Sequence, residues 1–295
     1  MNARILITGA NGQLGRELAR TVWPMPVELS VLNRNAADLA VRGSVAAAIE
    51  GLRPALVVNA AAYTAVDRAE AERDLAYAVN AEAPGEIAAV TARMGIPMVH
   101  VSTDYVFDGT KSAPYVEEDA IAPLGVYGAS KAQGESAVRA GNPLHLILRT
   151  SWVYGAEGQN FVRTMLRLGA EREELKVVDD QIGAPSAAFD LAGAIARISP
   201  ELFSGAAAWG TYHLTGRGKT SWHGFAEAIF ADMAMRSGRR PRLTPIPTSA
   251  YPTPAKRPAN SVLDNAKFRA AFGFALPDWK ESLTSVLSAL HEARA

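Results

Sequence analysis

The stretch "RILITGANGQLG", residues 4–15, decides the fold because an apolar run leads directly into a glycine-rich turn. Gly9, Gly12 and Gly15 follow with the spacing G-x-x-G-x-x-G, and an amphipathic run continues to about Arg20. In a strand–turn–helix unit these glycines permit a tight turn, close approach of a pyrophosphate, and close packing of the helix on the strand. The helix N-terminus then faces the negative charge. A turn without a ligand is the alternative; the predicted phosphate-facing residues are Gly12, Gln13 and Leu14.

Short apolar runs alternate with helical stretches through the first half of the chain. This alternation predicts a parallel sheet with helices on both faces, the doubly wound α/β arrangement of Rossmann type. The expected later strands are "VELSVLN" (27–33), "ALVVNAAA" (55–62), "MVHVSTD" (98–104) and "LHLILRTSWVYG" (144–155). The expected helices between them are 44–51, 68–94 and 126–140.

The second half has a different pattern, with "LKVVDDQIGAP" (175–185), a helix over about 190–198, the strand "GTYHLTG" (210–216) and a helix over about 222–235. Since the glycine-turn fold holds only a cofactor, a smaller substrate lobe is needed, and the cleft between lobes is the expected site. We expect interleaved lobes. The dinucleotide-binding domain is 1–150 and 185–216, and the substrate domain is 151–184 and 217–295.

Two segments of the second half lack a periodic pattern. The proline-rich "TPIPTSAYPTPAKRPANS" (244–261) is either a linker or a loop that closes over a ligand, and its Tyr, Lys and Arg favour the loop. The basic run "RSGRRPR" (236–242) is interpreted as a solvated surface loop.

Composition excludes several kinds of function. Thirty Lys and Arg balance thirty Asp and Glu, so no net charge favours nucleic acid or an anionic membrane. The chain has no cysteine and its five histidines are scattered, which argues against thiolate chemistry and a zinc site. No apolar run is long enough to span a membrane, and the sequence passes from Met1 straight into a strand. We therefore expect a cytoplasmic protein.

The stretch "VYGASK" (126–131) places Tyr127 and Lys131 four residues apart. Residues i and i+4 share one face of a helix, so the phenol and the ammonium can point into the same space. A nearby cation lowers the pKa of a phenol, which makes Tyr127 a candidate proton donor and Lys131 the group that adjusts it and contacts a cofactor ribose. The same spacing also occurs by chance on ordinary helices.

The end of the second predicted strand, "VLNRNAADL" (31–39), bears on the choice of nicotinamide cofactor. NAD-selective proteins place an acidic residue about 20 residues after the glycines to bind the ribose hydroxyls, whereas here Asn33 and Arg34 occupy that region. We therefore expect NADPH, with NADH as a further possibility, and Asp38 and Leu39 beside the adenine. An uninvolved surface arginine is the alternative for Arg34.

The ordered motifs "TGANGQLG", "VVNAAAYTAVDRAE", "VSTDYVFDG", "VYGASK", "RTSWVYG", "DDQIGAP" and "RPANS" span nearly the whole chain. Together they resemble the dTDP-4-dehydrorhamnose reductases, within the extended short-chain dehydrogenase/reductases. The resemblance implies reduction of the 4-keto group of dTDP-4-dehydro-6-deoxy-L-mannose to dTDP-L-rhamnose, which is used for cell-surface polysaccharide. A dTDP-sugar is therefore the expected partner.

The resemblance also implies roles for individual residues. Tyr127 would donate the proton to the C4 oxygen as negative charge develops there, and Thr103 would hydrogen-bond the same oxygen. Asp104 and Trp152 would hold and cover the sugar, although a core position is the alternative for Trp152. Arg257 is a candidate for the diphosphate, since its planar guanidinium binds phosphate oxygens in pairs. The residues expected to line the cofactor cleft after the third strand are Ala61, Ala62 and Tyr63.

A magnesium-bridged homodimer occurs in some members of this family. Glu17 matches the first glutamate ligand, but Phe189, beside Asp190, replaces the one expected after "GAP". Magnesium therefore lacks a full ligand set, no metal residue is predicted, and a homodimer stays one option.

Rival functions remain at this point. A sugar-nucleotide 4,6-dehydratase places Glu directly after the Thr-Asp pair, where this chain has Tyr105. A non-catalytic dinucleotide-binding subunit resembling the regulatory subunit of methionine adenosyltransferase would not need Thr103, Tyr127 and Lys131 together. Another sugar-nucleotide ketoreductase is the third alternative.

Overall fold

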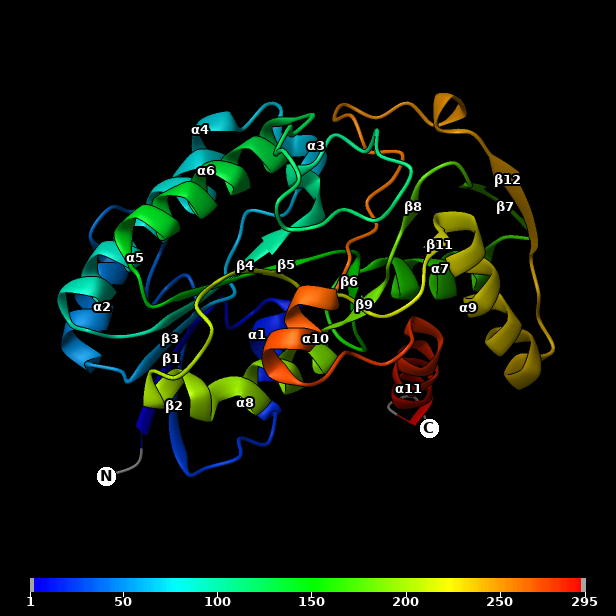
Figure 1. Cartoon of the computed structure of the whole chain (residues 1–295). Coiled ribbons are helices and arrows are strands. Elements are labelled where there is room, and N and C mark those ends of the chain that lie inside the picture. The colour runs from blue at the N-terminus through cyan, green and yellow to red at the C-terminus, as the bar shows by residue number, and fades with distance from the viewer. Residues whose placement is uncertain (1–2, 293–295) are drawn as a thin grey trace.

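A six-stranded parallel sheet runs through the computed structural model, which describes residues 3–292 (Figure 1). The chain passes from β1 to the edge strand β2 and returns to β3 on the other side of β1. The strand order therefore reverses between β1 and β3, the place where doubly wound folds bind ligands. In spatial order the strands are β2 (Val27–Leu32), β1 (Ala3–Thr8), β3 (Leu56–Asn59), β4 (Met98–Thr103), β5 (His145–Thr150) and β10 (Gly210–His213).

Alternating side chains of the strands build two cores, one on each face of the sheet. Ile5 and Ile7 of β1 point to one face and pack with Leu56 and Val58 of β3. Leu6, between them in the chain, packs on the opposite face. Because both faces are covered, the strands are continuous apolar runs, which is why the sequence predicts a parallel sheet.

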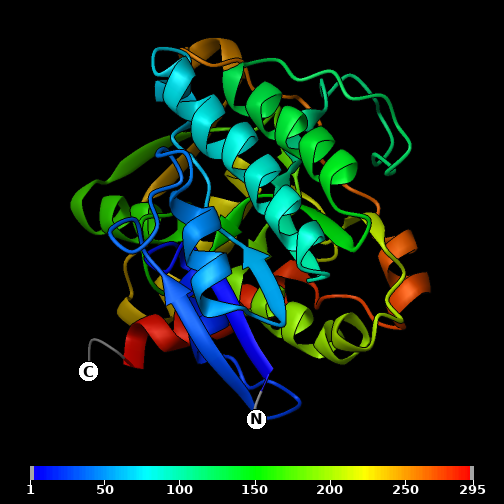
Figure 2. The same ribbon diagram turned by 90° about the vertical axis from the view of Figure 1, so that its left-hand side faces the viewer.

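Helices cover both faces, as the predicted fold class requires (Figure 2). One core contains side chains of α1 (Gln13–Arg20) and α8 (Ala188–Ser204). The other contains side chains of α2 (Ser44–Leu52), α5 (Ala83–Arg93) and α6 (Val126–Gly141). Prediction of a Rossmann-type α/β fold is thus confirmed.

The single helix predicted over 68–94 is wrong, since the structure divides this stretch. The backbone of Glu70 is still helical but that of Glu72 is not, and the Glu70 side chain accepts the backbone N–H of Val126 at 2.8 Å, which stabilises the start of α6. Farther on, Asn80 lies in a π-helical turn that joins α4 to α5 without a break, and its side chain bonds the backbone of Tyr63. The resulting elements are α3 (Val66–Ala69), α4 (Arg73–Tyr77), the five-residue π-helix η1 (Ala78–Glu82) and α5.

A second, smaller layer of elements has its own core, rich in aromatic side chains such as Phe225, Phe230 and Trp279. Three helices form it: α7 (Phe161–Glu171), α9 (Trp222–Ser237) and α11 (Trp279–Glu292). Of these the sequence predicted only α9. Its strands are paired as β7 (Glu174–Val178) with β12 (Arg242–Ile246), β6 (Val153–Tyr154) with β9 (Ser186–Ala187), and β8 (Ile182–Gly183) with β11 (Thr220–Ser221).

The chain crosses between the two layers more than once. Segment 185–216 returns through α8 to the edge strand β10, beside β5. Helix α10 (Ala266–Phe272) also packs with the first layer, where Phe268 and Phe272 join the core beneath the sheet. The boundary drawn at residue 217 therefore does not follow the packing over 266–272.

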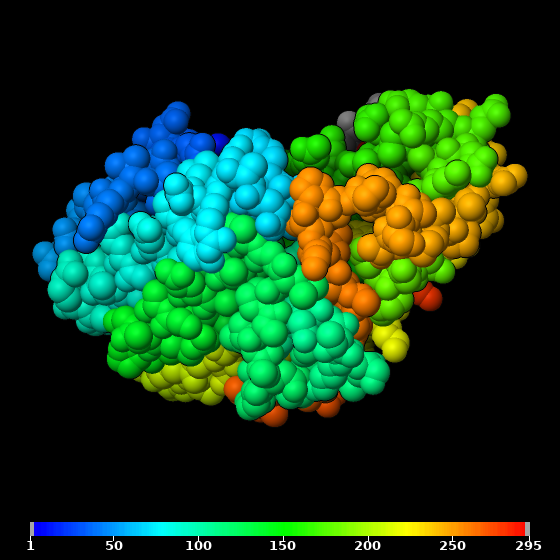
Figure 3. All heavy atoms as spheres, turned by 90° about the horizontal axis from the view of Figure 1, so that it is seen from above, coloured from blue at the N-terminus to red at the C-terminus, as the bar shows by residue number. Residues whose placement is uncertain are grey.

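The proline-rich segment extends across the molecule and contacts the first layer (orange in Figure 3). Its start forms β12, and η3 (Thr248–Ala250) follows. The backbone N–H of Ala255 then contacts Asp67 at 3.2 Å, and the Asn260 amide donates to the carbonyl of Lys111 at 2.7 Å. The segment is thus anchored at both lobes rather than free as a linker. The basic run 236–242 is mostly exposed, and it comprises the last two residues of α9, the connection and the first residue of β12.

Candidate active site

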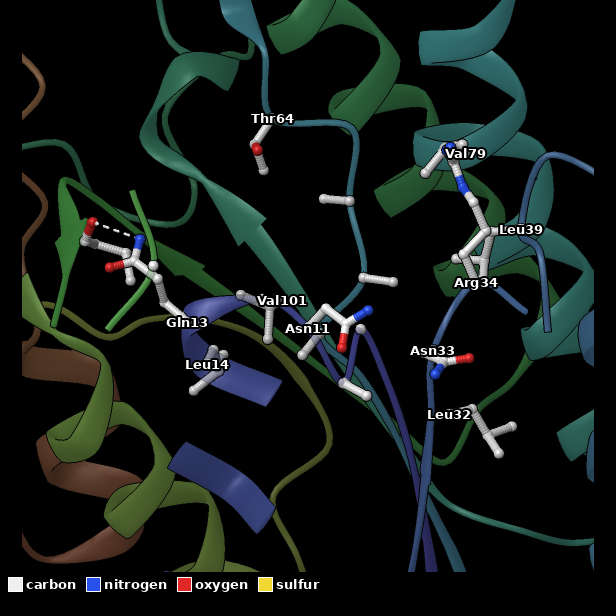
Figure 4. Close-up of a pocket in the computed structure, with 18 of the residues that line it drawn as sticks. Asn11, Gln13, Leu14, Leu32, Asn33, Arg34, Leu39, Thr64, Val79 and Val101 are labelled. Atoms are coloured by element: carbon white, nitrogen blue, oxygen red, sulfur yellow. Dashed lines mark hydrogen bonds between the residues drawn. The ribbon is translucent and has the colours of Figure 1, made fainter. Parts of the chain in front are cut away.

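A cavity of about 450 Å³ opens at the carboxyl ends of β1, β2, β3 and β4 (Figure 4). Its size suits a small-molecule ligand. It lies at the order reversal of the sheet, and both halves of the predicted site contribute to it. The predicted residues that line it are Gly9, Gly12, Gln13, Leu14, Arg34, Asp38, Leu39, Ala61, Ala62, Tyr127 and Lys131.

The glycine turn requires glycine for two separate steric reasons. Gly9 has a φ of 81°, and a Cβ there would approach the Ala61 nitrogen to 2.8 Å. A Cβ on Gly15 would lie 2.0 Å from the carbonyl oxygen of Gly9, so only glycine lets α1 start this close to the turn. Consequently the free backbone N–H groups at the start of α1 open into the cavity, which fits an anionic phosphate group.

Gln13 differs from its neighbours because its side chain reaches the second lobe. Its Nε2 donates to the carbonyl of Val153 at 3.3 Å (dashed line in Figure 4). Its Oε1 accepts from the Asn160 amide at 2.9 Å. The turn is therefore fixed to β6 and to the start of α7.

Arg34 lies at the end of β2, on the rim of the cavity. Its side chain is 67% exposed and its Nε lies 3.7 Å from Asp38 Oδ1. The guanidinium is thus held loosely and is able to turn toward an anionic ligand.

Tyr127 and Lys131 lie one turn apart at the start of α6 and both face the cavity, as their spacing predicts. Lys131 is buried and its Nζ donates to the carbonyl of Val101 at 2.6 Å. Burial lowers the pKa of Lys131 to about 8, and the nearby Glu135 opposes this change.

The prediction that Lys131 lowers the pKa of the Tyr127 phenol is wrong for this structure. Burial raises the pKa of Tyr127 to about 12, and the Asp104 charge adds to the increase, while the Thr103 hydroxyl opposes it. Lys131 does not contribute to this shift in pKa, and desolvation sets its direction. The phenol stays protonated at neutral pH, which is the state that a proton donor needs.

Thr103 and Asp104 follow directly at the end of β4 and are both buried. Thr103 Oγ1 donates to Asp104 Oδ1 at 3.0 Å and accepts from the Tyr105 backbone at 3.2 Å. Burial raises the pKa of Asp104 to about 6, opposed by the hydroxyls of Ser261 and Thr103. Its Oδ2 is buried without a hydrogen-bond partner among residues 3–292. Beside them, the Tyr105 ring meets the Tyr127 ring edge-on at 5.5 Å.

Trp152 is held in an uncommon backbone conformation for a non-glycine residue, with a φ of 46°. Its indole is stacked on Trp222 with ring centroids 3.5 Å apart and an angle of 5° between the planes. Gly183 leaves room for this indole, since a Cβ there would come within 2.3 Å of it. The strained backbone and the stack together fix the orientation of Trp152, which is typical of functional sites.

Arg257, in the proline-rich segment, forms a two-point ion pair with Asp67 of α3. Its two terminal nitrogens lie 3.1 Å and 2.8 Å from the carboxylate oxygens, and it also bonds Thr253. The guanidinium lowers the pKa of Asp67. The planar face expected for a diphosphate is therefore occupied by a carboxylate of the other lobe.

Six predicted residues of the described range 3–292 lie outside the cavity lining, and several lining residues were missed; the six are Gly15, Tyr63, Thr103, Asp104, Trp152 and Arg257. The Tyr63 hydroxyl donates to Glu72 at 2.5 Å, and neither Tyr63 nor Thr103 is among the lining residues of the described chain. The missed residue with the clearest signal is Thr150, at the end of β5, whose buried Oγ1 has no partner within residues 3–292. Its position at the end of a predicted strand is the sequence signal that could have identified it. The other missed polar lining residues include Asn11, Thr64, Ser102 and Gln159.

Glu17 and Asp190, which were considered as magnesium ligands, each have their own separate environment. Burial raises the pKa of Glu17, and Asp190 accepts a hydrogen bond from Ser282 at 2.5 Å. Phe189 beside it is 36% exposed. Within residues 3–292, no group of three or more His, Asp or Glu side chains could hold a metal ion. No helix in the same range is long and apolar enough to cross a membrane.

A parallel sheet with a glycine turn at its order reversal, and a Tyr-Lys pair facing the same cavity, define an oxidoreductase of the Rossmann class. Residues 3–292 match the family model described as the RmlD substrate binding domain. The dTDP-4-dehydrorhamnose reductase of Burkholderia thailandensis is 52% identical over 285 residues, which cover 94% of this chain and 95% of that protein. The chain belongs to the dTDP-4-dehydrorhamnose reductase family.

Solved structures agree with this assignment. The dTDP-4-dehydrorhamnose reductase of Clostridium acetobutylicum has a TM-score of 0.91 and 41% identity, with 98% of this chain and 99% of that chain covered. The enzyme from Bacillus anthracis, in complex with NADP, has a TM-score of 0.91 and 37% identity, covering 98% of this chain and all of the other.

Proposed function

We propose that this protein uses NADPH to reduce the 4-keto group of dTDP-4-dehydro-6-deoxy-L-mannose to dTDP-L-rhamnose. The observation that carries the proposal is the shared cavity, in which Tyr127 and Lys131 from α6 face the glycine turn after β1. Full-length similarity to reductases of this name supports the substrate class.

The residues that line the cavity fit a dinucleotide. The close approach of Gly15 to the Gly9 carbonyl leaves the α1 amides open to phosphate, and the unpaired Thr150 hydroxyl provides a further polar contact. Bound NADPH supplies the hydride. Lys131, held by the carbonyl of Val101, would bind the ribose and fix its orientation.

Tyr127 performs the acid step in this proposal. Hydride addition leaves negative charge on the C4 oxygen, and a protonated phenol within hydrogen-bond reach neutralises it as it develops. The high pKa of Tyr127 keeps the phenol protonated over the neutral range. Thr103, at the adjoining strand end, would hydrogen-bond the same oxygen.

Arg34 would favour NADPH over NADH by contacting the 2'-phosphate, with Asp38 and Leu39 beside the adenine. The NADP complex of the Bacillus anthracis relative supports this choice of cofactor.

The substrate half of the site would lie between the dinucleotide-binding domain (1–150 and 185–216) and the rest of the chain. Asp104 would bind the sugar and Trp152 would cover it, while Arg257 would exchange Asp67 for the diphosphate. Location in the cytoplasm and assembly as a homodimer stay predictions.

A coupled assay tests the proposal against its rivals. Incubation with NADPH and the keto-sugar nucleotide should cause loss of absorbance at the nicotinamide band, and the Tyr127→Phe variant serves as the matched control. Binding of NADPH without turnover would instead support a regulatory subunit. In a second arm, dTDP-glucose and NAD should give no 4-keto-6-deoxy product, because Tyr105 stands where a dehydratase has Glu. Product in that arm would contradict simple reduction.

A further inference from the structure

Lys131 is the end of a chain of buried polar side chains that crosses adjacent strands of the sheet. Its Nζ lies 3.4 Å from Nε2 of His100 on β4, and Nδ1 of His100 lies 3.0 Å from the amide nitrogen of Asn59 on β3. Asn59 Oδ1 in turn lies 2.6 Å from the hydroxyl of Thr8 on β1. All four side chains are at most 1% exposed. Three adjacent strands therefore contribute polar groups to one line that ends at the proposed cofactor contact.

The charge on Lys131 dictates where the protons of this chain must lie. An ammonium only donates hydrogen bonds, and a neutral imidazole has one N–H and one acceptor nitrogen. Burial and the neighbouring Lys131 hold the pKa of His100 well below its usual range, so the ring is neutral. Beside a charged Lys131, Nε2 must accept and Nδ1 must carry the proton. Asn59 then has to present its oxygen to His100 and its NH₂ group to Thr8.

The opposite arrangement fits only an uncharged amine. This is the orientation of Asn59 in the structure: its NH₂ group faces Nδ1 and its Oδ1 accepts from Thr8, which puts the imidazole proton on Nε2, pointing at Lys131. Two donors would then meet unless Nζ has a lone pair to offer. The two arrangements differ by a half-turn of the Asn59 amide, which leaves its shape unchanged. The proton positions in this chain of polar side chains are therefore coupled to the charge of Lys131.

The other charged groups around α6 do not act as the acceptor for the Lys131 ammonium. Glu135, one turn beyond Lys131, forms a buried ion pair with Arg149 and also accepts from Ser102. Tyr127 is protonated, and Asp104 is bonded by Thr103. The side chains that α3, α4, η1 and α5 bury are all uncharged. Besides the carbonyl of Val101, His100 is thus the acceptor that the interior offers to the ammonium.

We propose that His100, oriented by Asn59 and Thr8, is a positioning residue that accepts from the Lys131 ammonium and keeps it charged at the cavity. This rests on the proposed role of Lys131 in cofactor binding. Thr8 also accepts the backbone N–H of Ala61 at 3.3 Å, and Ala61 lines the same cavity. The chain therefore joins two sides of the cofactor site through the interior of the sheet.

A spectroscopic test needs no catalytic activity. Full-length protein with ¹⁵N-labelled histidine is recorded without ligands, and the His100→Gln variant assigns the His100 signals among the five histidines. At pH 6.5 we expect the Nδ1–H form, with a change toward the Nε2–H form as Lys131 loses its proton above pH 8. In Lys131→Met this pH-dependent change should disappear. An Nε2–H form at pH 6.5 in the wild type, or one form throughout the range, would overturn the proposal.

The kinetic test compares variants that remove or replace the acceptor. His100→Leu should move the alkaline limb of the kcat/KM profile down by about one pH unit, and at pH 7.5 this lowers kcat/KM about threefold, because the charged fraction of Lys131 falls from about three-quarters to about one-quarter. His100→Gln should recover most of both, since its Oε1 can accept where Nε2 does. His145→Leu, at a buried histidine of β5 bonded to Asn142, is the control and should lower Tm without moving the limb.

The outcomes separate this proposal from the proposed function. A limb that stays in place in a folded His100→Leu protein, or a His100→Gln variant no better than His100→Leu, would contradict the positioning role. If the wild type oxidises no NADPH with the keto-sugar, the proposed function fails, while the proton positions measured by NMR still decide the state of His100.

Discussion

The two lobes prepare their halves of the site in opposite ways. In the first lobe, Tyr127 and Lys131 already face an open cavity, and their polar contacts come from the fixed backbone and buried side chains of the sheet. In the second lobe and the proline-rich segment, Trp152 is stacked on Trp222 and Arg257 is paired with Asp67. In the proposed function the cofactor half is therefore formed in advance, whereas the substrate half would exchange a protein contact for a ligand contact.

This difference follows from the structure that supports the site residues of each lobe. The first lobe has two hydrophobic cores around six strands, and its site residues project from strand and helix ends whose positions those cores fix. Arg257 instead lies on a segment with little regular structure, and its partner Asp67 belongs to the other lobe. Changes in the first lobe should thus alter turnover and cofactor binding. Changes at Arg257 should alter substrate binding.

The largest effect is expected for Tyr127→Phe. The variant keeps the ring and its edge-on contact with Tyr105 but lacks the donated proton, so kcat should fall by about 10²- to 10⁴-fold. The dissociation constant for NADPH, measured by fluorescence titration, should change little. Near wild-type turnover together with a lower Tm would show that Tyr127 is a packing residue.

Lys131→Met should reduce turnover and NADPH affinity together, because one side chain serves both in the proposed function. The pKa of Lys131 lies near 8, below its usual value, so the charged form exists at lower pH and is lost as the pH rises through about 8. Wild-type kcat/KM should therefore fall on the alkaline side near pH 8. In Lys131→Met the residual activity, followed from pH 6 to pH 10, should lack that limb; a limb that persists would assign it to another group.

Substitution of Arg257 tests the difference between the two lobes directly. Arg257→Ala should raise KM for the sugar nucleotide by about tenfold at saturating NADPH, the low end of the range for charge-assisted hydrogen bonds. Asp67→Asn removes the competing carboxylate charge and should leave that KM unchanged or lower. The control is Arg167→Ala, in an exposed ion pair of α7. An unchanged KM in Arg257→Ala would mean that this ion pair only joins the lobes.

The smallest effect is expected at the rim. Arg34→Ala should raise KM for NADPH several-fold and leave KM for NADH nearly unchanged, because exposed charge contacts contribute about 1 kcal/mol or less. Arg93→Ala, in an exposed pair with Glu50, is the matched control. Equal effects on both cofactors would remove Arg34 from the 2'-phosphate site.

The sequence by itself determined the features that depend on local spacing. Apolar runs and the glycines at 9 and 15 predict β1, the turn and α1, since a side chain at either glycine has no space. The i, i+4 spacing places Tyr127 and Lys131 on one face of α6 whatever surrounds them. The strand-end rule likewise predicts where the cavity opens.

Only the tertiary structure decided what depends on burial and on contacts between distant residues. The pKa of Tyr127 rises rather than falls because the phenol is desolvated, and no spacing of Tyr and Lys reveals how much water each loses. Arg257 meets Asp67 across 190 positions of the chain, and Lys131 meets His100 only because α6 packs on β4. Local sequence sets backbone periodicity, whereas the free energy of a charge is set by the groups that packing brings around it.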